Sequence, residues 1–413
     1  MCTHNTQTND ETESDSDSSS FNSNMSDSDS SDSDVDMSDN SEAEEKSHVE
    51  GEESKENKEE DEDEDEDDEL VKAIKAAKEK NRKHPPDICF DDLLVDISFH
   101  PDNEIVAAGN VVGDVFMYKY SNDSNELLRT LELHVSACRG IEFSSDGTVL
   151  YSCGKDKSIM LTDTETGKLK KFYDNAHEDP LYSLYVFDEN VICTGDEEGT
   201  IKVWDIRRDT PVMSFKKMED FVSDIITNDA KKFLVCSSGD GTITSFNMST
   251  KKMFIQSEGY DAELNCMQVL KYECKLLAGS SKGKMYLFNW GEFGYHSDEY
   301  SGPKSAINKM LAITEHTVIA GYEDGTIRAA NFFPQKQLGI VGQHEFSIES
   351  MDISHDGEYI ASTSLDQRVK FWNIRYFEDL FVKKKKSNKK LEMEKNLPSS
   401  KVKNLSDFFG ELN

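Results

Sequence analysis

Few residues of this chain could carry chemistry, and the first candidate is a serine between two glycines. Residues 279–283 read GSSKG, which fits the G-x-S-x-G pattern of a nucleophile elbow. That elbow needs a strand followed by a helix, with an acid and a histidine later in the chain. Here the segment lies in a hairpin of a sequence repeat, and no helical pattern follows it. We therefore expect a structural turn rather than a catalytic serine.

Metal and nucleotide sites are not favoured either. The ten histidines contain no H-x-x-x-H pair and the eight cysteines contain no C-x-x-C pair, although these are the spacings typical of zinc sites. No Walker-type glycine loop is present. The sequence predicts a protein that is not an enzyme and that uses no cofactor or metal.

A repeated strand and turn pattern positions these residues. Its clearest copy is TGDEEGTIKVWDIR at residues 194–207, where a short alternating apolar run follows a tight turn, as in a half-buried strand. Successive copies are separated by 44 residues once and then by 42 residues five times. A period of about 40–45 residues is typical of propeller blades with four strands each. The residue just after the turn is, in order, Asp114, Ser158, Thr200, Thr242, Lys284, Thr326 and Arg368.

An aromatic residue followed by Asp or Asn usually lies four residues after this mark, as in Trp204-Asp205 and Trp372-Asn373. The pattern resembles the WD-repeat family of β-propellers over roughly residues 87–376. The resemblance implies an all-β fold with seven blades, in which a His, a Ser or Thr, an Asp and the Trp form a buried hydrogen-bonded set. The last blade keeps this set best, with His344, Ser362 or Ser364, Asp366 and Trp372.

Other blades depart from the family pattern. The second has His134 and Asp156 but Thr162 in place of the tryptophan, and the third has His177 but Glu198 in place of the aspartate. The fourth and fifth have no histidine before the first strand. We expect packing alone to hold the hairpins of those two blades.

A closed propeller must also seal its ring. In the resembled family the outer strand of the last blade often comes from the opposite end of the chain. Residues 88–90 (ICF) are our candidate for that strand, and residues 376–382 are the alternative. The propeller domain is placed at residues 87–382.

Charge divides the rest of the chain. The formal net charge is −36, and residues 1–69 hold 29 Asp or Glu against three Lys. Such a segment has too little apolar surface to fold, so we predict disorder. Residues 70–86 should form a short helix and linker, and residues 383–413 a disordered basic tail. No apolar run approaches the ~20 residues needed to cross a bilayer, so we expect no membrane contact.

Both tails carry candidate signals. In the acidic head Ser14, Ser26 and Ser31 each have Asp three residues later, a pattern similar to that favoured by acid-directed kinases. In the basic tail a lysine run indicates a nuclear or nucleolar signal, or a weak RNA contact. A merely solvated tail is the alternative for both. The run consists of Lys383, Lys384, Lys385 and Lys386.

Two groups of cations in the propeller could bind partners. Lys155 and Lys282 lie in hairpin turns and Arg139 opens a strand near the expected channel, so they could contact an acidic peptide or phosphate, or simply be surface cations. Residues 204–207 (WDIR) resemble the W-D-x-R box of substrate receptors for cullin-type ubiquitin ligases. By that resemblance Arg207 would recruit the ligase.

The complete layout looks like the family of WD-repeat protein 55, with its acidic Ser/Asp head, seven blades and Lys-rich extension. The resemblance implies a nucleolar, non-catalytic scaffold that modulates ribosomal RNA production and large-subunit assembly. Its partners would be pre-ribosomal factors or basic ribosomal proteins, and we expect a monomer. The alternatives are a ubiquitin-ligase substrate receptor and an acidic histone-binding chromatin factor.

Overall fold

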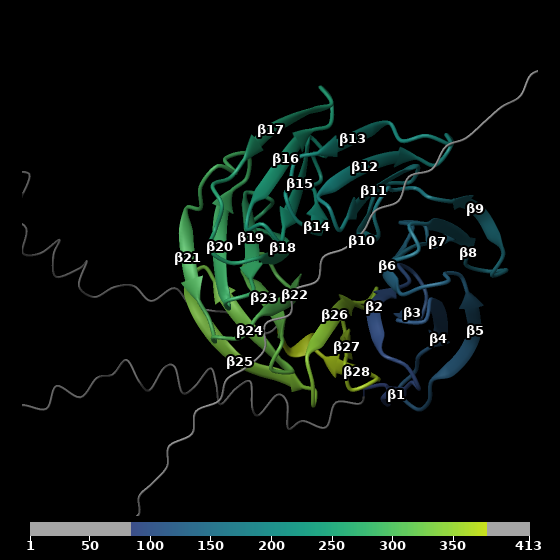
Figure 1. Ribbon diagram of the computed structural model, residues 1–413. Coiled ribbons are helices and arrows are strands. Elements are labelled where there is room, and N and C mark those ends of the chain that lie inside the picture. Colours follow the sequence, from purple (N-terminus) through teal and green to yellow (C-terminus); the bar gives the residue numbers. More distant parts are fainter. Residues whose placement is uncertain (1–83, 378–413) are drawn as a thin grey trace, which may run out of the picture. The chain divides into compact units, whose positions relative to one another are not determined.

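Short alternating apolar runs, separated by turns that contain Gly, Asp or Asn, form antiparallel strands. The computed structural model describes residues 84–377, and these contain seven four-stranded antiparallel sheets. The sheets follow one another around a common axis, with the first strand of each nearest that axis (Figure 1). The predicted all-β propeller with seven blades is confirmed. Residues 1–83 and 378–413 lie outside the described range, so the predictions for the head, the 70–83 helix and the tail stay predictions.

Blades 1 to 4 are continuous along the chain. Their strands are β2 (Leu94–Phe99), β3 (Ile105–Asn110), β4 (Asp114–Lys119) and β5 (Glu126–Glu132); β6 (Cys138–Phe143), β7 (Val149–Gly154), β8 (Ile159–Asp163) and β9 (Leu169–Tyr173); β10 (Leu181–Asp188), β11 (Val191–Asp196), β12 (Thr200–Asp205) and β13 (Met213–Lys216); and β14 (Val222–Ile226), β15 (Phe233–Ser238), β16 (Ile243–Asn247) and β17 (Lys252–Gln256).

Blades 5 and 6 are built in the same way, and blade 7 takes its fourth strand from elsewhere. Their strands are β18 (Leu264–Leu270), β19 (Lys275–Ser280), β20 (Lys284–Asn289) and β21 (Asp298–Ser301); β22 (Ile307–Ala312), β23 (Thr317–Tyr322), β24 (Thr326–Phe332) and β25 (Gln335–Gln343); and β26 (Ile348–Ile353), β27 (Tyr359–Ser364), β28 (Arg368–Asn373) and β1 (Ile88–Cys89). A 3-10 turn, η1 (Arg375–Phe377), follows β28.

The repeat mark is the first residue of the third strand in five blades and lies one residue before it in blades 2 and 4. Thr200, Lys284 and Thr326 are the first residues of β12, β20 and β24. The preceding turn needs a left-handed residue, which is Gly241 (φ 78°) in blade 4; a Cβ there would lie 2.3 Å from the carbonyl oxygen of Tyr260. Gln367 adopts the same conformation in blade 7 (φ 62°). The hairpin turns therefore lie where the sequence period placed them.

The N-terminal segment seals the ring. Ile88 and Cys89 pair with Val369 and Arg368 of β28, and the Phe90 N–H donates to the Gln367 carbonyl at 2.9 Å. The prediction that residues 88–90 supply this strand is confirmed. Tyr376 and Phe377, from the alternative segment, are buried in the core between blades 6 and 7 instead.

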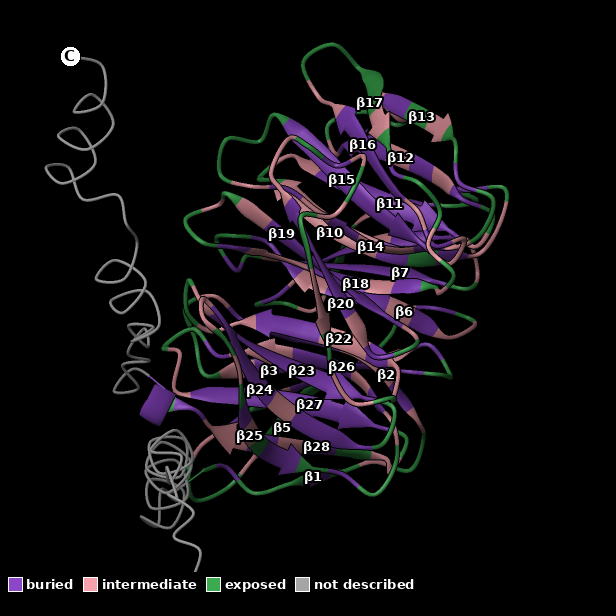
Figure 2. Ribbon diagram, turned by 90° about the vertical axis from the view of Figure 1, so that its left-hand side faces the viewer, coloured by how far each residue is buried: buried purple, intermediate pink, exposed green. Residues whose placement is uncertain are grey.

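The hydrophobic core lies between neighbouring blades. Ile201 and Val203 of blade 3, for example, pack in one cluster with Val222 and Leu234 of blade 4. Burying one such aliphatic side chain stabilises the fold by about 1.5–3 kcal/mol. In Figure 2 buried residues run along the strands while exposed residues gather in the connecting loops. The rigid core thus leaves the loops free to make contacts.

Candidate protein-binding site at the channel mouth

The four residues predicted for the last blade form one hydrogen-bonded chain. His344 Nδ1 lies 2.8 Å from Asp366 Oδ2, and His344 Nε2 lies 2.7 Å from the Ser362 hydroxyl, which also accepts from Trp372 Nε1 at 2.8 Å. Ser362, and not Ser364, is therefore the serine of the set. A neutral imidazole that donates from Nδ1 and accepts at Nε2 satisfies every group. Because the polar groups of all four residues hydrogen-bond within the set, the set is structural.

Blade 3 corrects one prediction. His177 Nδ1 contacts Asp196 Oδ2 at 2.9 Å, and Thr194 Oγ1 lies 2.8 Å from His177 Nε2 and accepts from Trp204 Nε1. Glu198 was wrongly assigned as the acid, since its backbone N–H only donates to Asp196 Oδ1. Relative to the repeat, His177 lies one residue later in its loop than the histidines of blades 2 and 7. Its partner is Asp196, which comes before Glu198 in the turn.

The histidines of these sets are held neutral. Burial lowers the pKa of His177 and of His344 below the ordinary value. Burial would raise the pKa of Asp196, but hydrogen bonds from His177 and from the Thr200 N–H outweigh it and hold that pKa below its ordinary value. Asp196 is thus charged and hydrogen-bonded beside a neutral ring.

Blade 4, which lacks the histidine, is not held by packing alone, contrary to the prediction. Asp240 in its turn accepts the Glu219 N–H at 2.9 Å and the Thr242 N–H and hydroxyl at 2.8 and 2.7 Å. In blade 5 Lys282 lies 3.0 Å from Asp261. Short polar contacts join the turn to the preceding loop in both blades.

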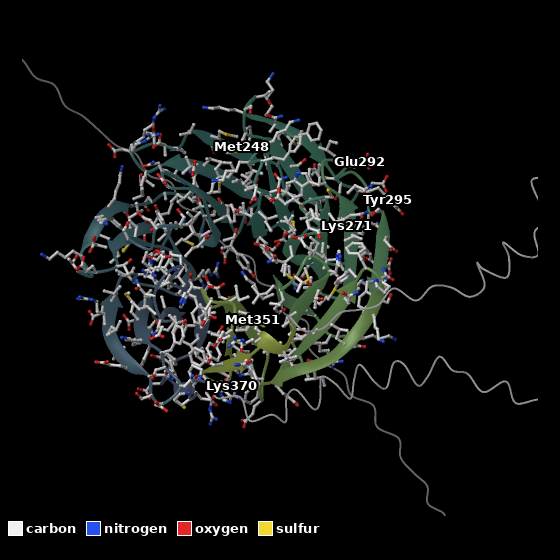
Figure 3. The ribbon with its side chains drawn as sticks, turned by 180° about the vertical axis from the view of Figure 1, so that it is seen from behind. Met248, Lys271, Glu292, Tyr295, Met351 and Lys370 are labelled. Atoms are coloured by element: carbon white, nitrogen blue, oxygen red, sulfur yellow. The ribbon has the colours of Figure 1, made fainter. Side chains whose placement is uncertain are left out.

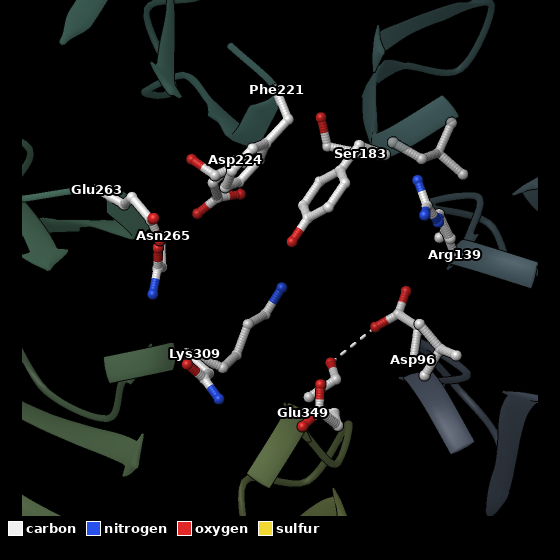
Figure 4. A pocket seen from close by; sticks show the side chains of 16 residues that line it. Asp96, Arg139, Ser183, Phe221, Asp224, Glu263, Asn265, Lys309 and Glu349 are labelled. Atoms are coloured by element: carbon white, nitrogen blue, oxygen red, sulfur yellow. Dashed lines mark hydrogen bonds between the residues drawn. The ribbon is translucent and has the colours of Figure 1, made fainter. Parts of the chain in front are cut away.

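A cavity of about 430 Å³ opens between the innermost strands. Each of the seven blades contributes residues at or next to the start of its first strand, so the cavity is one end of a central channel (Figure 4). Its lining is mostly polar. It includes Asp96, Arg139, Tyr182, Ser183, Phe221, Asp224, Glu263, Asn265, Lys309 and Glu349.

Four carboxylates of the innermost strands each join one blade to the next. Asp96 accepts the Ile141 N–H of blade 2 at 2.8 Å, and Asp224 accepts the Met267 N–H of blade 5 at 2.7 Å. Two more pairs follow the same rule: Glu142 with the Val186 N–H (2.8 Å) and Asp352 with the Phe99 N–H (2.6 Å). These acids therefore hold neighbouring blades together and also make the channel acidic.

The channel keeps a lysine among these acids. The Lys309 side chain extends into the cavity (Figure 4) and makes no hydrogen bond or ion pair with residues 84–377. Burial opposes its charge, but Asp224, Asp96 and Asp352 outweigh burial and raise the pKa of Lys309. Burial raises the pKa of Glu142 to about 8. The channel interior is acidic overall, with one charged lysine within it.

The mouth itself combines aromatic rings with acids. Tyr182 and Phe221 of neighbouring blades lie with ring centroids 4.6 Å apart. Arg139 lies 5.4 Å from the Tyr182 ring centroid and pairs with Glu197 at 2.5 Å. Across the mouth, burial and then the nearby Glu323 raise the pKa of Glu349. A rigid, acidic and partly aromatic mouth suits binding of a basic peptide segment.

The predicted partner-binding cations do not form one patch. Lys155 lies in a turn of blade 2 and Lys282 in a turn of blade 5, on different sectors of the ring. Arg139 does line the channel, but Glu197 neutralises it. Arg207 follows β12 at the opposite ends of the strands, where Asp205 holds its guanidinium at 2.8 and 2.7 Å while 68% of the side chain stays exposed.

The candidates for chemistry remain structural. Ser281, the serine of the G-x-S-x-G pattern, is half-buried in a hairpin turn, where its N–H donates to the Glu263 carbonyl at 2.9 Å, and strand β20 rather than a helix follows it. Burial raises the thiol pKa of Cys138, Cys153 and Cys193, so these cysteines are protonated and unreactive. In the described range no group of three or more His, Cys, Asp or Glu is placed to hold a metal ion. No helix between residues 84 and 377 is long and apolar enough to cross a bilayer.

The remaining predicted sites lie outside the described residues. They are the phosphorylation candidates Ser14, Ser26 and Ser31 and the lysine run at 383–386.

Sequence reasoning missed the channel acids and Lys309. A signal for them existed, since each is a charged residue within the otherwise apolar first strand of its repeat, as in LVDISF (94–99) and INKMLA (307–312). A charge in such a position is costly unless it faces water or a partner. Here the acids face the channel and accept backbone N–H groups of the next blade.

Comparison with known proteins agrees with this architecture. The WDR55 family model matches residues 85–377. The chain is similar to proteins named WD repeat-containing protein 55 homolog: 48% identical to that of Aedes aegypti (83% of this chain, 74% of the relative), 48% to that of Drosophila melanogaster (83% and 70%) and 49% to that of Drosophila willistoni (83% and 69%). The chain belongs to the WDR55 family.

Proposed function

We propose, from membership in the WDR55 family, that this protein is a non-catalytic nucleolar scaffold in ribosomal RNA production and large-subunit assembly. The observation that carries the proposal is the acidic channel mouth, where Glu263 and Glu349 form no ion pair with any described residue. Ribosomal proteins and many assembly factors bind RNA and are basic. An acidic rigid mouth attracts such partners electrostatically.

The tails support the same role through their composition. Residues 1–69 carry 29 acidic residues and residues 383–413 carry nine lysines. An acidic arm can screen basic partners from non-specific contacts, and a lysine-rich tail can hold the protein near RNA. The propeller then acts as the platform between them.

Depletion of the protein from cells tests this proposal. We expect uncleaved ribosomal RNA precursors to accumulate, and re-expression of the wild-type chain to restore processing. A chain with Lys383, Lys384, Lys385 and Lys386 changed to Ala should leave the nucleolus and restore processing poorly. Normal precursor levels after depletion would overturn the nucleolar role.

A second candidate function is substrate recruitment to a cullin-type ubiquitin ligase. The favouring observation is that Asp205 orients the guanidinium of Arg207 while most of that side chain is exposed. Arg207→Ala should then abolish co-purification of a ligase adaptor. The matched control is Arg208→Ala, because Arg208 has a similar side-chain exposure of 66% but no bidentate contact.

A further inference from the structure

Five exposed apolar side chains lie on the same end of the propeller as the channel mouth. They belong to the loops before the first strands and to the turns before the third strands of blades 7, 1 and 2. Other large apolar side chains of the propeller, such as Tyr272 and Tyr295, are also exposed, but they lie outside these loops and turns. We call this set the apolar arc. Its members and their exposed fractions are Phe346 (58%), Leu365 (42%), Val111 (39%), Val112 (51%) and Val135 (88%).

Hydrogen bonds between neighbouring loops make the arc continuous. In blade 7 the Ser364 hydroxyl donates to the Phe346 carbonyl at 3.0 Å and fixes the two loops of that blade together. Gln367 donates to the Asp91 carbonyl of the next blade at 3.0 Å. The Val111 N–H then donates to the Leu93 carbonyl at 3.0 Å.

The junction with blade 2 is equally close. The His134 N–H donates to the Gly113 carbonyl at 3.0 Å, which joins the loop that carries Val135 to the turn that carries Val112. The five residues are therefore held on one rim by backbone contacts. Exposed apolar side chains that gather on one face of a protein often mark a binding surface.

Acidic residues border the arc. Asp91 and Asp92 lie in the loop of blade 1, Glu345 precedes Phe346, and Glu349 lies at the channel mouth three residues after it. Within residues 84–377 none of these four acids forms an ion pair. Lys155 borders the arc only at its blade 2 end, where the Val135 N–H donates to Asp156. Blade 7 also carries the exposed Arg368, three residues after Leu365, and Lys370, which pairs with Asp366 at 3.7 Å, so the excess of unpaired acids at that end is three or four carboxylates against one cation.

We propose that the apolar arc is a docking surface for a basic, apolar peptide segment of a partner protein. Apolar side chains of the segment pack on Val111, Val112 and Val135, and its Lys or Arg residues lie over Glu345 and Glu349 at the blade 7 end. The direction of the bound segment follows from Lys155, which lies at the blade 2 end and disfavours a cation of the segment there. The inference rests on the proposed scaffold function, for which it names the partner's chemistry and the sector of the ring used.

A peptide selection tests the surface directly. The full-length protein is immobilised and used to select from a phage-displayed library of random dodecapeptides. Enriched sequences are synthesised, and their binding is measured by fluorescence anisotropy at low and high salt. We expect apolar residues combined with Lys or Arg, and affinity that falls with rising salt because the acids are exposed.

Two variants and one control locate the binding. The Phe346→Ser, Val112→Ser double variant should weaken binding about tenfold or more, since each change removes packed apolar area. The Asp91→Asn, Glu345→Gln variant should weaken binding and flatten its salt dependence. Tyr295→Ser is the control, because Tyr295 is similarly exposed (63%) but lies between β20 and β21 of blade 5, well away from Lys370 of blade 7 (Figure 3).

The outcomes separate this proposal from the scaffold function. Selection of acidic peptides, failure to enrich any sequence, or equal binding by the Phe346→Ser, Val112→Ser variant with an unchanged melting curve would overturn the docking surface. Normal precursor RNA after depletion would overturn the nucleolar role instead, and the peptide measurement would still decide the arc.

Discussion

Blades 7, 2 and 3 connect their loops through a buried histidine, whereas blade 4 connects the same loops without one. In blade 2 Asp156 accepts the Val135 N–H at 3.2 Å, and in blade 4 Asp240 accepts the Glu219 N–H at 2.9 Å. The contact between the turn aspartate and the preceding loop is therefore common to both kinds of blade. The histidine adds a second set of hydrogen bonds that reaches into the sheet.

What fills the histidine position in the other blades is mostly apolar. Met218 in blade 4 is buried, and Tyr260 in blade 5 stacks on Tyr286 with centroids 4.2 Å apart. The Tyr260 N–H makes the same loop contact, to Gly241, that His344 makes to Gly325. The comparison shows that backbone hydrogen bonds hold this loop in place in both kinds of blade. Either a polar network or an apolar side chain can then occupy the site of the histidine.

Removal of the blade 7 histidine should have the largest effect. His344→Ala leaves Asp366 and Ser362 buried without their partner, which costs about 3 kcal/mol in the free energy of unfolding. Denaturant unfolding of the wild type and the variant measures the difference. Equal stability would show that the hydrogen-bonded network stabilises the blade no more than the apolar side chain at the same position of blade 4 does.

The acid of blade 3 gives the next largest effect. Asp196→Ala should lower the free energy of unfolding by about 2 kcal/mol, because His177 loses its buried hydrogen-bond partner. Glu198→Ala is the matched control and should change stability by less than about 0.5 kcal/mol, since that side chain is exposed. If thermal unfolding showed a larger loss of stability for Glu198→Ala than for Asp196→Ala, Glu198 would be the partner of His177.

Replacement of the turn aspartate in blade 4 should cost less than either. Asp240→Ala removes the hydrogen bonds from Glu219 and Thr242, but both donors lie near water and can be solvated. We expect a loss of about 1 kcal/mol in the free energy of unfolding. A loss as large as that of His344→Ala would mean that the aspartate, and not the histidine, dominates in every blade.

Lowering the pH should reduce the free energy of unfolding that His177 and His344 contribute, by a smaller amount than the substitutions above. Because folding lowers the pKa of His177 and His344 below 6.5, the unfolded chain binds more protons, and their stability contribution is lost as the pH falls below about 6.5. Glu142 has the opposite sign: its raised pKa makes stability fall as the pH rises from about 4.5 to about 8.

The two effects are separated with single variants. Unfolding of His344→Gln, measured between pH 7.5 and pH 5.5, should depend less on pH than that of the wild type, by on the order of 1 kcal/mol. Glu142→Gln, which keeps an oxygen for the Val186 N–H, should steepen the loss on the acid side. Parallel curves for all three proteins would contradict both assignments.

Much of the fold could be predicted from local spacing. A period of 42 residues, with one spacing of 44, located the turns, the number of blades and the residues His344, Asp366 and Trp372. These features depend on residues within one repeat, where covalent distance nearly determines spatial distance. The segment that seals the ring was predicted as one of two alternatives, because its pairing joins residues about 280 positions apart.

Only the tertiary structure decided how separate blades meet. The choice of Asp196 over Glu198 depends on a one-residue shift of the loop that carries His177. The acidic channel and the apolar arc each collect one or two residues from several blades, and no spacing within a repeat announces that these residues converge. The sequence by itself thus determined the repeating unit, whereas closure of the ring, a long-range event, decided which side chains share the channel and its rim.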